Sequence, residues 1–409
     1  MGVLRRTSRD IRSDSRLDVL HAVLSAGETT RNELAQLTGL SAATIATVVG
    51  ELMAGGFVVE TKTTAGRIGR PTATLAMNGA RGRVIGIDVA ETYIRAVLFD
   101  AALVEIAHAQ VVRDEHVLDP DSVVEGIGTA LERVIAEAGI ARSDVLGVGV
   151  SLPGLVQGPT SVSVVVPKWS WHQLEFDRLR ERVGLPLVID NPLKAMTTAE
   201  LWLGRGRYSS SLVTINLGTG VGAGIVLERR ILRGATNSAG EWGHSLLVLD
   251  GRRCRCGRHG CVEAYLGVPG IQQTLRELAP DHALVGLDQS DFIAALARAA
   301  DSADPDPAVT ETIERTAYYL GSAIADLVAI VNPEAVVLTG WTVWALADKL
   351  LPATGMHLRE QSPGWSAREL ELEVSTISRN SVATGVATTA LERFLADAGL
   401  LTSRVPIAL

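Results

Sequence analysis

Three cysteines lie within eight residues, in the segment Cys254-Arg-Cys256-Gly-Arg-His-Gly-Cys261, and the chain contains no others. Three thiolates and one imidazole make a closed tetrahedral zinc site, which is structural because no position is left for water. His244, ten residues before Cys254, is the candidate fourth ligand, and His259 inside the loop is the rival. Such crowding without a disulfide framework indicates bound zinc rather than free thiols.

A second group of residues has the chemistry of DNA recognition. Small, polar and methyl-bearing side chains begin a predicted helix, at Ser41, Ala42, Ala43, Thr44 and Thr47. In a major groove they suit phosphate contacts and packing against thymine methyl groups. In the tip at 66–71, Arg67 and Arg70 would reach a minor groove, whose negative potential attracts arginine. The alternatives are a helical protein-interaction module and a solvated basic loop.

The elements around these residues follow the order of a winged helix-turn-helix. Apolar spacing predicts a helix over 16–26. Thr30 and Glu33 fit a capping box that opens a helix ending at about residue 38, and Ser41 caps a third helix that ends at residue 54. Two strands, 57–61 and 72–77, then flank the arginine tip. Together these elements predict a DNA-binding domain.

Beyond a polar hinge at 78–83, the chain alternates between strands and helices. A meander followed by alternating strands and helices occurs twice, which suggests two α/β lobes around a cleft. The predicted strands are 84–89, 94–99, 104–112, 145–150, 187–189, 212–217, 222–227 and 335–339. The predicted helices are 123–138, 193–203, most of 266–331 and 382–398.

The composition excludes several classes of protein. The 409 residues suffice for about two to four domains. A hydrophobic share of 47% and a charged share of 21% exclude wholesale disorder. The first residues are charged, unlike a signal peptide, and the long uncharged runs at 145–167 and 208–227 are broken by glycine, proline and serine. We expect a soluble, cytoplasmic protein with no membrane partner.

The charge is distributed unevenly along the chain. Residues 1–80 hold 9 Lys+Arg and 7 Asp+Glu, a net charge of +2, so the other 329 residues carry −10 of the total of −8. The part of the chain that is expected to bind DNA therefore carries a positive net charge, and the rest of the chain carries a negative one.

Several motifs resemble those of the ROK family of repressors, open reading frames and sugar kinases. The segment 240–244 resembles its G-E-x-G-H, 254–263 its C-x-C-G-x-x-G-C-x-E, and 217–224 its L-G-T-G-x-G-x-G. The corner Asn332-Pro-Glu before a buried strand also matches. With the helix-turn-helix in front, the resemblance covers nearly the whole chain. It implies an α/β fold in which the winged helix-turn-helix precedes a two-lobed, actin-like body of the hexokinase type.

The resemblance also implies a sugar pocket between the lobes. In the family's kinases an Asn-Asp pair holds and deprotonates one sugar hydroxyl, and Glu, His and Glu from the zinc segment bind others. By position these are Asn191, Glu241, His244 and Glu263. His244 would serve zinc with one ring nitrogen and sugar with the other. The alternative is that the two glutamates only support the zinc loop and that Asn191 only caps a helix.

Three positions depart from the kinase pattern. The catalytic aspartate is replaced by Pro192, and loss of a positioned base costs about 10²–10⁴-fold in rate. The first phosphate loop reads Asp88-Val-Ala-Glu91-Thr, which places a carboxylate where the γ-phosphate would lie. Trp341 stands where the adenosine side needs glycine. We therefore expect that the protein is not an enzyme.

These observations predict a sugar-responsive transcriptional regulator of the repressor type that binds operator DNA, a small sugar or sugar derivative, and Zn. The alternatives are a residual sugar kinase and a ligand-independent regulator with a vestigial pocket. We expect a homodimer or homotetramer, because two recognition helices double the operator footprint.

The expected domains follow from the same patterns. Residues 1–78 form the DNA-binding domain and residues 79–409 the sensor. Lobe I is expected at about 79–195 together with 382–409. Lobe II is expected at about 196–381, with the zinc loop at 244–263.

Overall fold

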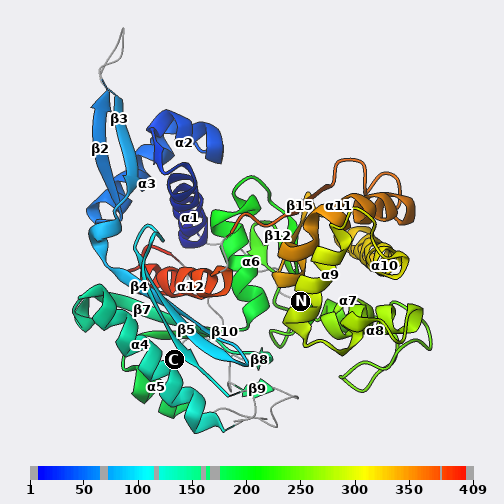
Figure 1. Cartoon of the computed structure of the whole chain (residues 1–409). Coiled ribbons are helices and arrows are strands. Elements are labelled where there is room, and N and C mark those ends of the chain that lie inside the picture. The colour runs from blue at the N-terminus through cyan, green and yellow to red at the C-terminus, as the bar shows by residue number, and fades with distance from the viewer. Residues whose placement is uncertain are drawn as a thin grey trace. The chain divides into compact units, whose positions relative to one another are not determined.

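The computed structural model describes residues 8–64, 72–114, 119–157, 163–165, 176–377 and 380–401. The chain divides into two compact units (Figure 1). Unit 1 consists of Met1–Arg207 and Ile377–Leu409, and unit 2 of Tyr208–Thr376. The chain therefore returns to unit 1 after completing unit 2.

Unit 1 begins with a small domain of three helices and an antiparallel sheet in the order β1-β3-β2. Its elements are α1 (Ser8–Ala26), β1 (Glu28–Thr29), α2 (Arg31–Thr38), α3 (Ala42–Ala54), β2 (Val58–Thr64) and β3 (Thr72–Met77). The Thr30–Glu33 capping box forms, and its hydrogen bonds lower the pKa of Glu33. The predicted inner face of α3 is buried at Ile45, Val48, Val49 and Leu52. The predicted winged helix-turn-helix is confirmed, with a longer first helix.

A five-stranded sheet organises the rest of unit 1. Its strands are β4 (Arg83–Val89), β5 (Tyr93–Asp100), β6 (Glu105–Val112), β7 (Val145–Ser151) and β10 (Leu187–Asp190), in the order β10-β7-β4-β5-β6. The meander β4-β5-β6 is antiparallel, and β7 and β10 extend it in parallel. The other described elements are η1 (Gly79–Arg81), α4 (Pro120–Ala138), η2 (Arg142–Asp144), β8 (Leu155–Gln157), β9 (Ser163–Val165), α5 (Phe176–Val183), α6 (Pro192–Leu203), η4 (Arg205–Arg207) and α12 (Ser381–Asp397).

Helices cover both faces of this sheet. One face packs its Val and Ile side chains against α4 and α5. The other face meets α12 so closely that a Cβ atom at Gly86 would lie 1.8 Å from the carbonyl oxygen of Ala383, and one at Gly149 would lie 2.0 Å from that of Val386. The glycines let the last long helix of the chain lie directly on the central strands.

Unit 2 repeats the same topology. Its strands are β11 (Leu212–Leu217), β12 (Val221–Leu227), β13 (Arg230–Ile231), β14 (Ala335–Thr339) and β15 (Glu371–Val374), in the order β13-β12-β11-β14-β15. Its helices are η5 (Trp242–His244), α7 (Glu263–Leu266), α8 (Val268–Leu278), η6 (Ala283–Gly286), α9 (Gln289–Ala300), α10 (Pro307–Val331) and α11 (Trp341–Gln361). Each sheet is a meander extended by two parallel strands. The prediction of two α/β lobes is therefore confirmed.

Two further findings concern the described residues only. The boundary expected at 195/196 falls inside α6, which belongs entirely to unit 1. No single described helix is long and apolar enough to cross a membrane; α2 and α3 pass that test of length and composition only as a pair, and the pair is bent by 113°.

Candidate functional site

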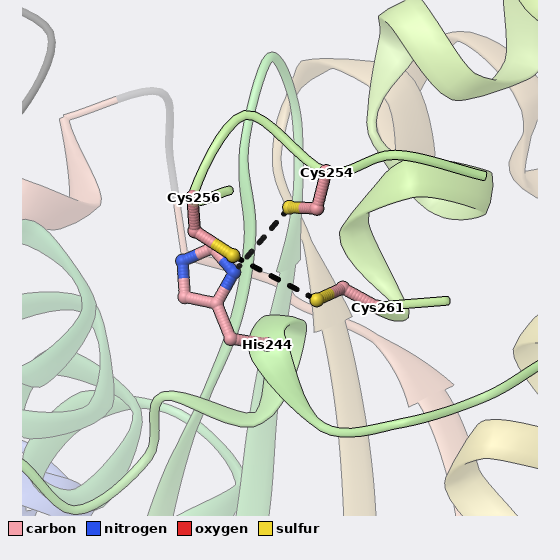
Figure 2. A group of neighbouring side chains, drawn as sticks. All are labelled: His244, Cys254, Cys256 and Cys261. Atoms are coloured by element: carbon pink, nitrogen blue, oxygen red, sulfur yellow. Dashed lines mark hydrogen bonds between the residues drawn. The ribbon is translucent and has the colours of Figure 1, made fainter. Parts of the chain in front are cut away.

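Four side chains from two segments of unit 2 form a candidate metal centre (Figure 2). The ligand atoms of His244, Cys254, Cys256 and Cys261 all lie within 4.8 Å of one another. His244 Nδ1 is 3.7 Å from Cys254 Sγ, and Cys256 Sγ is 3.8 Å from Cys261 Sγ. A tetrahedral zinc with Zn–S bonds of about 2.3 Å separates its sulfur ligands by about 3.8 Å, so the observed spacing fits zinc.

Tight turns in unit 2 bring these ligands together. The amide of Gly257 donates to the carbonyl of Cys254 over 3.0 Å, and Gly257 has a φ of +91°. At Gly260, with a φ of +76°, a Cβ atom would lie 1.9 Å from a carbonyl oxygen of the neighbouring segment. Gly243 packs equally tightly on β12, and this contact holds His244 against the cysteine loop. His259 is exposed and is not part of the group.

The thiols of the candidate site differ in how readily they ionise. Burial raises the pKa of the Cys254 thiol to about 12. Burial also disfavours the Cys256 thiolate, but hydrogen bonds from the backbone of Arg258 and with the other two cysteines outweigh it, so the pKa of Cys256 is lowered. A metal ion beside these sulfurs would favour their thiolate forms. Thiolate and imidazole ligands suit zinc and disfavour magnesium and calcium, which prefer oxygen. With four protein ligands, the metal would hold the loop together rather than activate water.

Glu263 follows the last cysteine of the loop and is buried, with 7% of its surface exposed. Its carboxylate accepts two hydrogen bonds from Arg255, at 2.7 and 2.9 Å, and a third from the amide of Val221 at 3.1 Å. These contacts fix the orientation of the carboxylate. Sequence reasoning missed Arg255; its place between Cys254 and Cys256, in the same motif as Glu263, is the signal that was available.

Glu241 and His244 lie on the segment before the loop. Glu241 is exposed, and its carboxylate has no hydrogen-bond partner among the described residues. His244 is half-buried, with Nδ1 facing Cys254. Beside Glu263 and Arg255, a cavity of about 720 Å³ opens in unit 2; Glu241 and His244 do not line it.

Asn191 lies in unit 1, whereas the other three expected sugar ligands, Glu241, His244 and Glu263, belong to unit 2. The Asn191 side chain is buried, and its Oδ1 accepts from the amide of Lys194 at 2.9 Å, which caps α6. The capping role considered for Asn191 is thus present. Pro192 is the first residue of α6, where a missing N–H leaves no hydrogen bond broken.

Trp341 and Glu91, which depart from the kinase pattern, lie in different units. The Trp341 indole lies against the glycine-rich loop, where a Cβ atom at Gly218 would be 2.7 Å from Trp341 Nε1. In unit 1, Glu91 lies in the turn after β4. Near that turn, the Tyr93 hydroxyl donates to Asp88 Oδ2 over 3.1 Å, and burial raises the pKa of Asp88 to about 6.

The candidate DNA-contacting residues begin α3. Ser41, Ala42, Ala43 and Thr47 are exposed and Thr44 is half-buried. The Ser41 hydroxyl accepts from the Thr44 amide and so caps the helix. Arg67 and Arg70 lie outside the described residues. Arg12 of α1 forms an ion pair with Glu51 of α3.

Comparisons with known proteins match two separate parts of the chain. The family model described as the ROK family matches residues 84–392, and the model described as winged helix-turn-helix DNA-binding matches residues 12–59. A solved ROK family transcriptional regulator, a homologue of the E. coli MLC protein, superposes with a TM-score of 0.75 at 23% identity, covering 96% of this chain and 99% of that one. That likeness shows that the two chains share a fold.

Two curated relatives differ in how much of the chain they match. The xylose repressor of Caldicellulosiruptor bescii is 25% identical over 91% of this chain and 94% of its own length. The glucokinase of Halalkalibacterium halodurans is 30% identical over 63% of this chain and 80% of its own length. The repressor therefore matches nearly the whole chain, whereas the kinase match leaves over a third of it uncovered.

Proposed function

This chain belongs to the ROK family, and from that premise we propose that it is a sugar-responsive transcriptional repressor whose kinase-like body binds a sugar without phosphorylating it. The observation that carries the proposal is the joining, in one chain, of a winged helix-turn-helix to a family body that keeps the sugar-binding residue types and lacks the catalytic base. Such a body senses a ligand, and the DNA-binding domain provides the response.

The DNA-binding part of the proposal concerns residues 1–78. The exposed start of α3 would enter a major groove through Ser41, Ala42, Ala43, Thr44 and Thr47, with Arg67 and Arg70 at the adjacent minor groove. The net charge of +2 over residues 1–80 supports this assignment, because the rest of the chain carries −10 and repels the phosphate backbone.

The sensing part concerns residues 79–409. Asn191, Glu241, His244 and Glu263 would bind neighbouring hydroxyls of a small neutral sugar. The hydrogen bonds that Arg255 and the Val221 amide donate to the Glu263 carboxylate support this role. A carboxylate that is already oriented before the sugar binds loses less conformational freedom on binding. Zinc on His244, Cys254, Cys256 and Cys261 would fix the segment that carries three of these residues.

Loss of phosphoryl transfer is the third part of the proposal. Pro192 cannot accept a proton, and the Trp341 indole occupies the space beside Gly218 that a nucleotide would need. The second candidate function is a residual sugar kinase, and the match to a glucokinase over the body is the observation that favours it.

The test measures DNA affinity and sugar affinity separately. An operator selected from a random DNA library is titrated with the full chain, with and without D-xylose, the sugar named for the relative. We expect D-xylose to change operator affinity. Glu241→Ala should weaken D-xylose binding by about 10–150-fold, the equivalent of about 1.5–3 kcal/mol for a charged hydrogen bond, and leave sugar-free operator affinity unchanged.

Glu369→Ala is the matched control, because it removes another exposed carboxylate from unit 2. It should leave both affinities as in the parent protein. A Glu241→Ala protein that responds to D-xylose like the parent would show that the pocket assignment is wrong. ATP-dependent phosphorylation of the sugar that disappears in Glu241→Ala would favour the kinase instead.

A further inference from the structure

The end of α6 is buried against the DNA-binding domain within unit 1. The His21 ring of α1 lies 3.9 Å from the Trp202 ring, measured between ring centroids, at an angle of 52°. Both side chains are almost completely buried, with 3% and 1% of their surfaces exposed. Trp202 Nε1 also donates to Glu392 Oε1 of α12 over 2.7 Å. The indole of Trp202 is therefore held by α12 on one side and contacts α1 on the other.

A second set of contacts joins the DNA-binding domain to α12 and the residues after it. Arg16 Nη1 donates to the carbonyls of Gly399 and Leu400, at 3.2 and 3.0 Å. Arg16 Nε donates to Glu51 of α3, the predicted recognition helix, over 2.7 Å. The Phe57 and Phe394 rings pack 6.0 Å apart. The position of α3 therefore depends on where α6 and α12 lie.

The opposite end of α6 begins at a proposed sugar ligand. Asn191 caps α6, and Trp202 lies eleven positions further on, near its end. At 1.5 Å per residue, the helix spans about 18 Å. Nine of its residues are buried, and a Cβ atom at Gly385 of α12 would lie 1.7 Å from the carbonyl oxygen of Ala195. Such packing leaves no room for α6 to bend, so a displacement at Asn191 reaches Trp202.

We propose that Trp202 and His21 are positioning residues through which a sugar at Asn191 controls the orientation of the DNA-binding domain. The inference rests on the proposed function, because it takes Asn191 as a sugar ligand. Sugar binding shifts α6 along with α12, the Trp202 indole moves against His21, and α1 carries α3 with it through Arg16 and Glu51. Neither positioning residue touches the sugar or the DNA.

The first test separates coupling from binding. Operator affinity of the full chain is measured with and without D-xylose for the parent, His21→Ala and Trp202→Phe. We expect a sugar-induced change in the range of about 5–150-fold in the parent and of no more than about twofold in both variants. D-xylose affinity, measured by calorimetry, and sugar-free operator affinity should stay within about threefold of the parent. Phe292→Leu, a buried aromatic substitution in unit 2, is the control and should keep the parent's response.

The second test needs no sugar. Hydrogen–deuterium exchange of the α1 amides is compared between the parent and Asn191→Ala, with α10 of unit 2 as the internal reference. We expect faster exchange in α1 and no change in α10. Unchanged α1 exchange, or a full sugar response in His21→Ala and Trp202→Phe, would overturn the inference. A parent that ignores D-xylose would contradict the proposed sugar response, while the exchange experiment still decides the role of α6.

Discussion

The four candidate metal ligands give the sharpest prediction at the scale of single residues. Cys256 is exposed, so Cys256→Ser removes one ligand with little change in packing. We expect this variant to lose the bound zinc, about one ion per chain in the parent, and to show a lower melting temperature. Metal analysis of the purified protein and thermal unfolding measure the two effects.

His259→Ala is the control for this prediction, because His259 lies in the same loop and outside the ligand group. It should keep the full zinc content, whereas His244→Ala should lose it. The reverse outcome would exchange the roles of the two histidines and would also remove the argument that one residue serves both zinc and sugar.

Asp88 gives a prediction on stability and pH. Burial raises the pKa of Asp88 to about 6, from 3.8, so the folded protein holds this proton more tightly than the unfolded chain does. The loss of folding stability that comes from ionising the buried Asp88 carboxyl is absent at low pH. It grows as the pH rises from about 4 to 6 and is complete above pH 6. Because part of Asp88 still reaches the surface, we expect Asp88→Asn to raise the free energy of unfolding at pH 7.5 by about 1–2 kcal/mol, less than the shift alone would give.

Chemical unfolding of Asp88→Asn at pH 7.5 and pH 4.5 measures this effect, and the gain should be much smaller at the lower pH. Asp121→Asn, at a carboxylate whose side chain is 60% exposed, should change stability by less than about 0.5 kcal/mol at both values. A destabilised Asp88→Asn protein at pH 7.5 would mean that the Tyr93 hydrogen bond to the carboxylate outweighs its burial.

At the scale of elements, the wing of the DNA-binding domain carries the next prediction. Replacing Arg67 or Arg70 with alanine removes one cation from the proposed DNA contact. We expect weaker operator binding and a decrease of about one in the slope of log affinity against log salt concentration, with unchanged sugar affinity. Arg368→Ala, an exposed arginine of unit 2, is the control and should leave the slope as in the parent.

The elements also show what local sequence patterns can predict. The capping box at Thr30, the apolar face of α3 and the two meanders were all predictable, because each depends on spacing within one segment. The helix α11 was not predicted: it begins without a side-chain cap and contains Pro352. β15 has four residues and becomes a strand by pairing with β14, which no local pattern reveals.

The candidate site was predictable to the same extent. The zinc loop could be predicted because its three cysteines are close in sequence, and their grouping with His244 agrees with the expected ligand set. The contact between His21 and Trp202 joins residues 181 positions apart, and neither residue carries a motif. Its energy comes from burying two rings together, which depends on the complete fold rather than on spacing.

At the scale of the whole molecule, we predict a homo-oligomer with two-fold symmetry that binds an inverted-repeat operator. A single winged helix covers a short stretch of DNA, and a second copy doubles the number of base contacts. Mass measurement in solution, with and without operator DNA, should give a dimer or tetramer. A monomer under both conditions would contradict this prediction, as would equal affinity for an isolated half-site.

The position of α12 in the chain has a consequence for how the protein is made. Strands β4 and β7 leave the ribosome long before α12, yet their glycines Gly86 and Gly149 lie directly under it. During synthesis one face of that sheet stays uncovered while all of unit 2 emerges. Helix α6 also lacks its packing against α12 until the end of the chain has been made. In a nascent chain the DNA-binding domain therefore lacks its contacts with α12. A chain that ends before α12 exposes apolar surface of the sheet to chaperones and proteases.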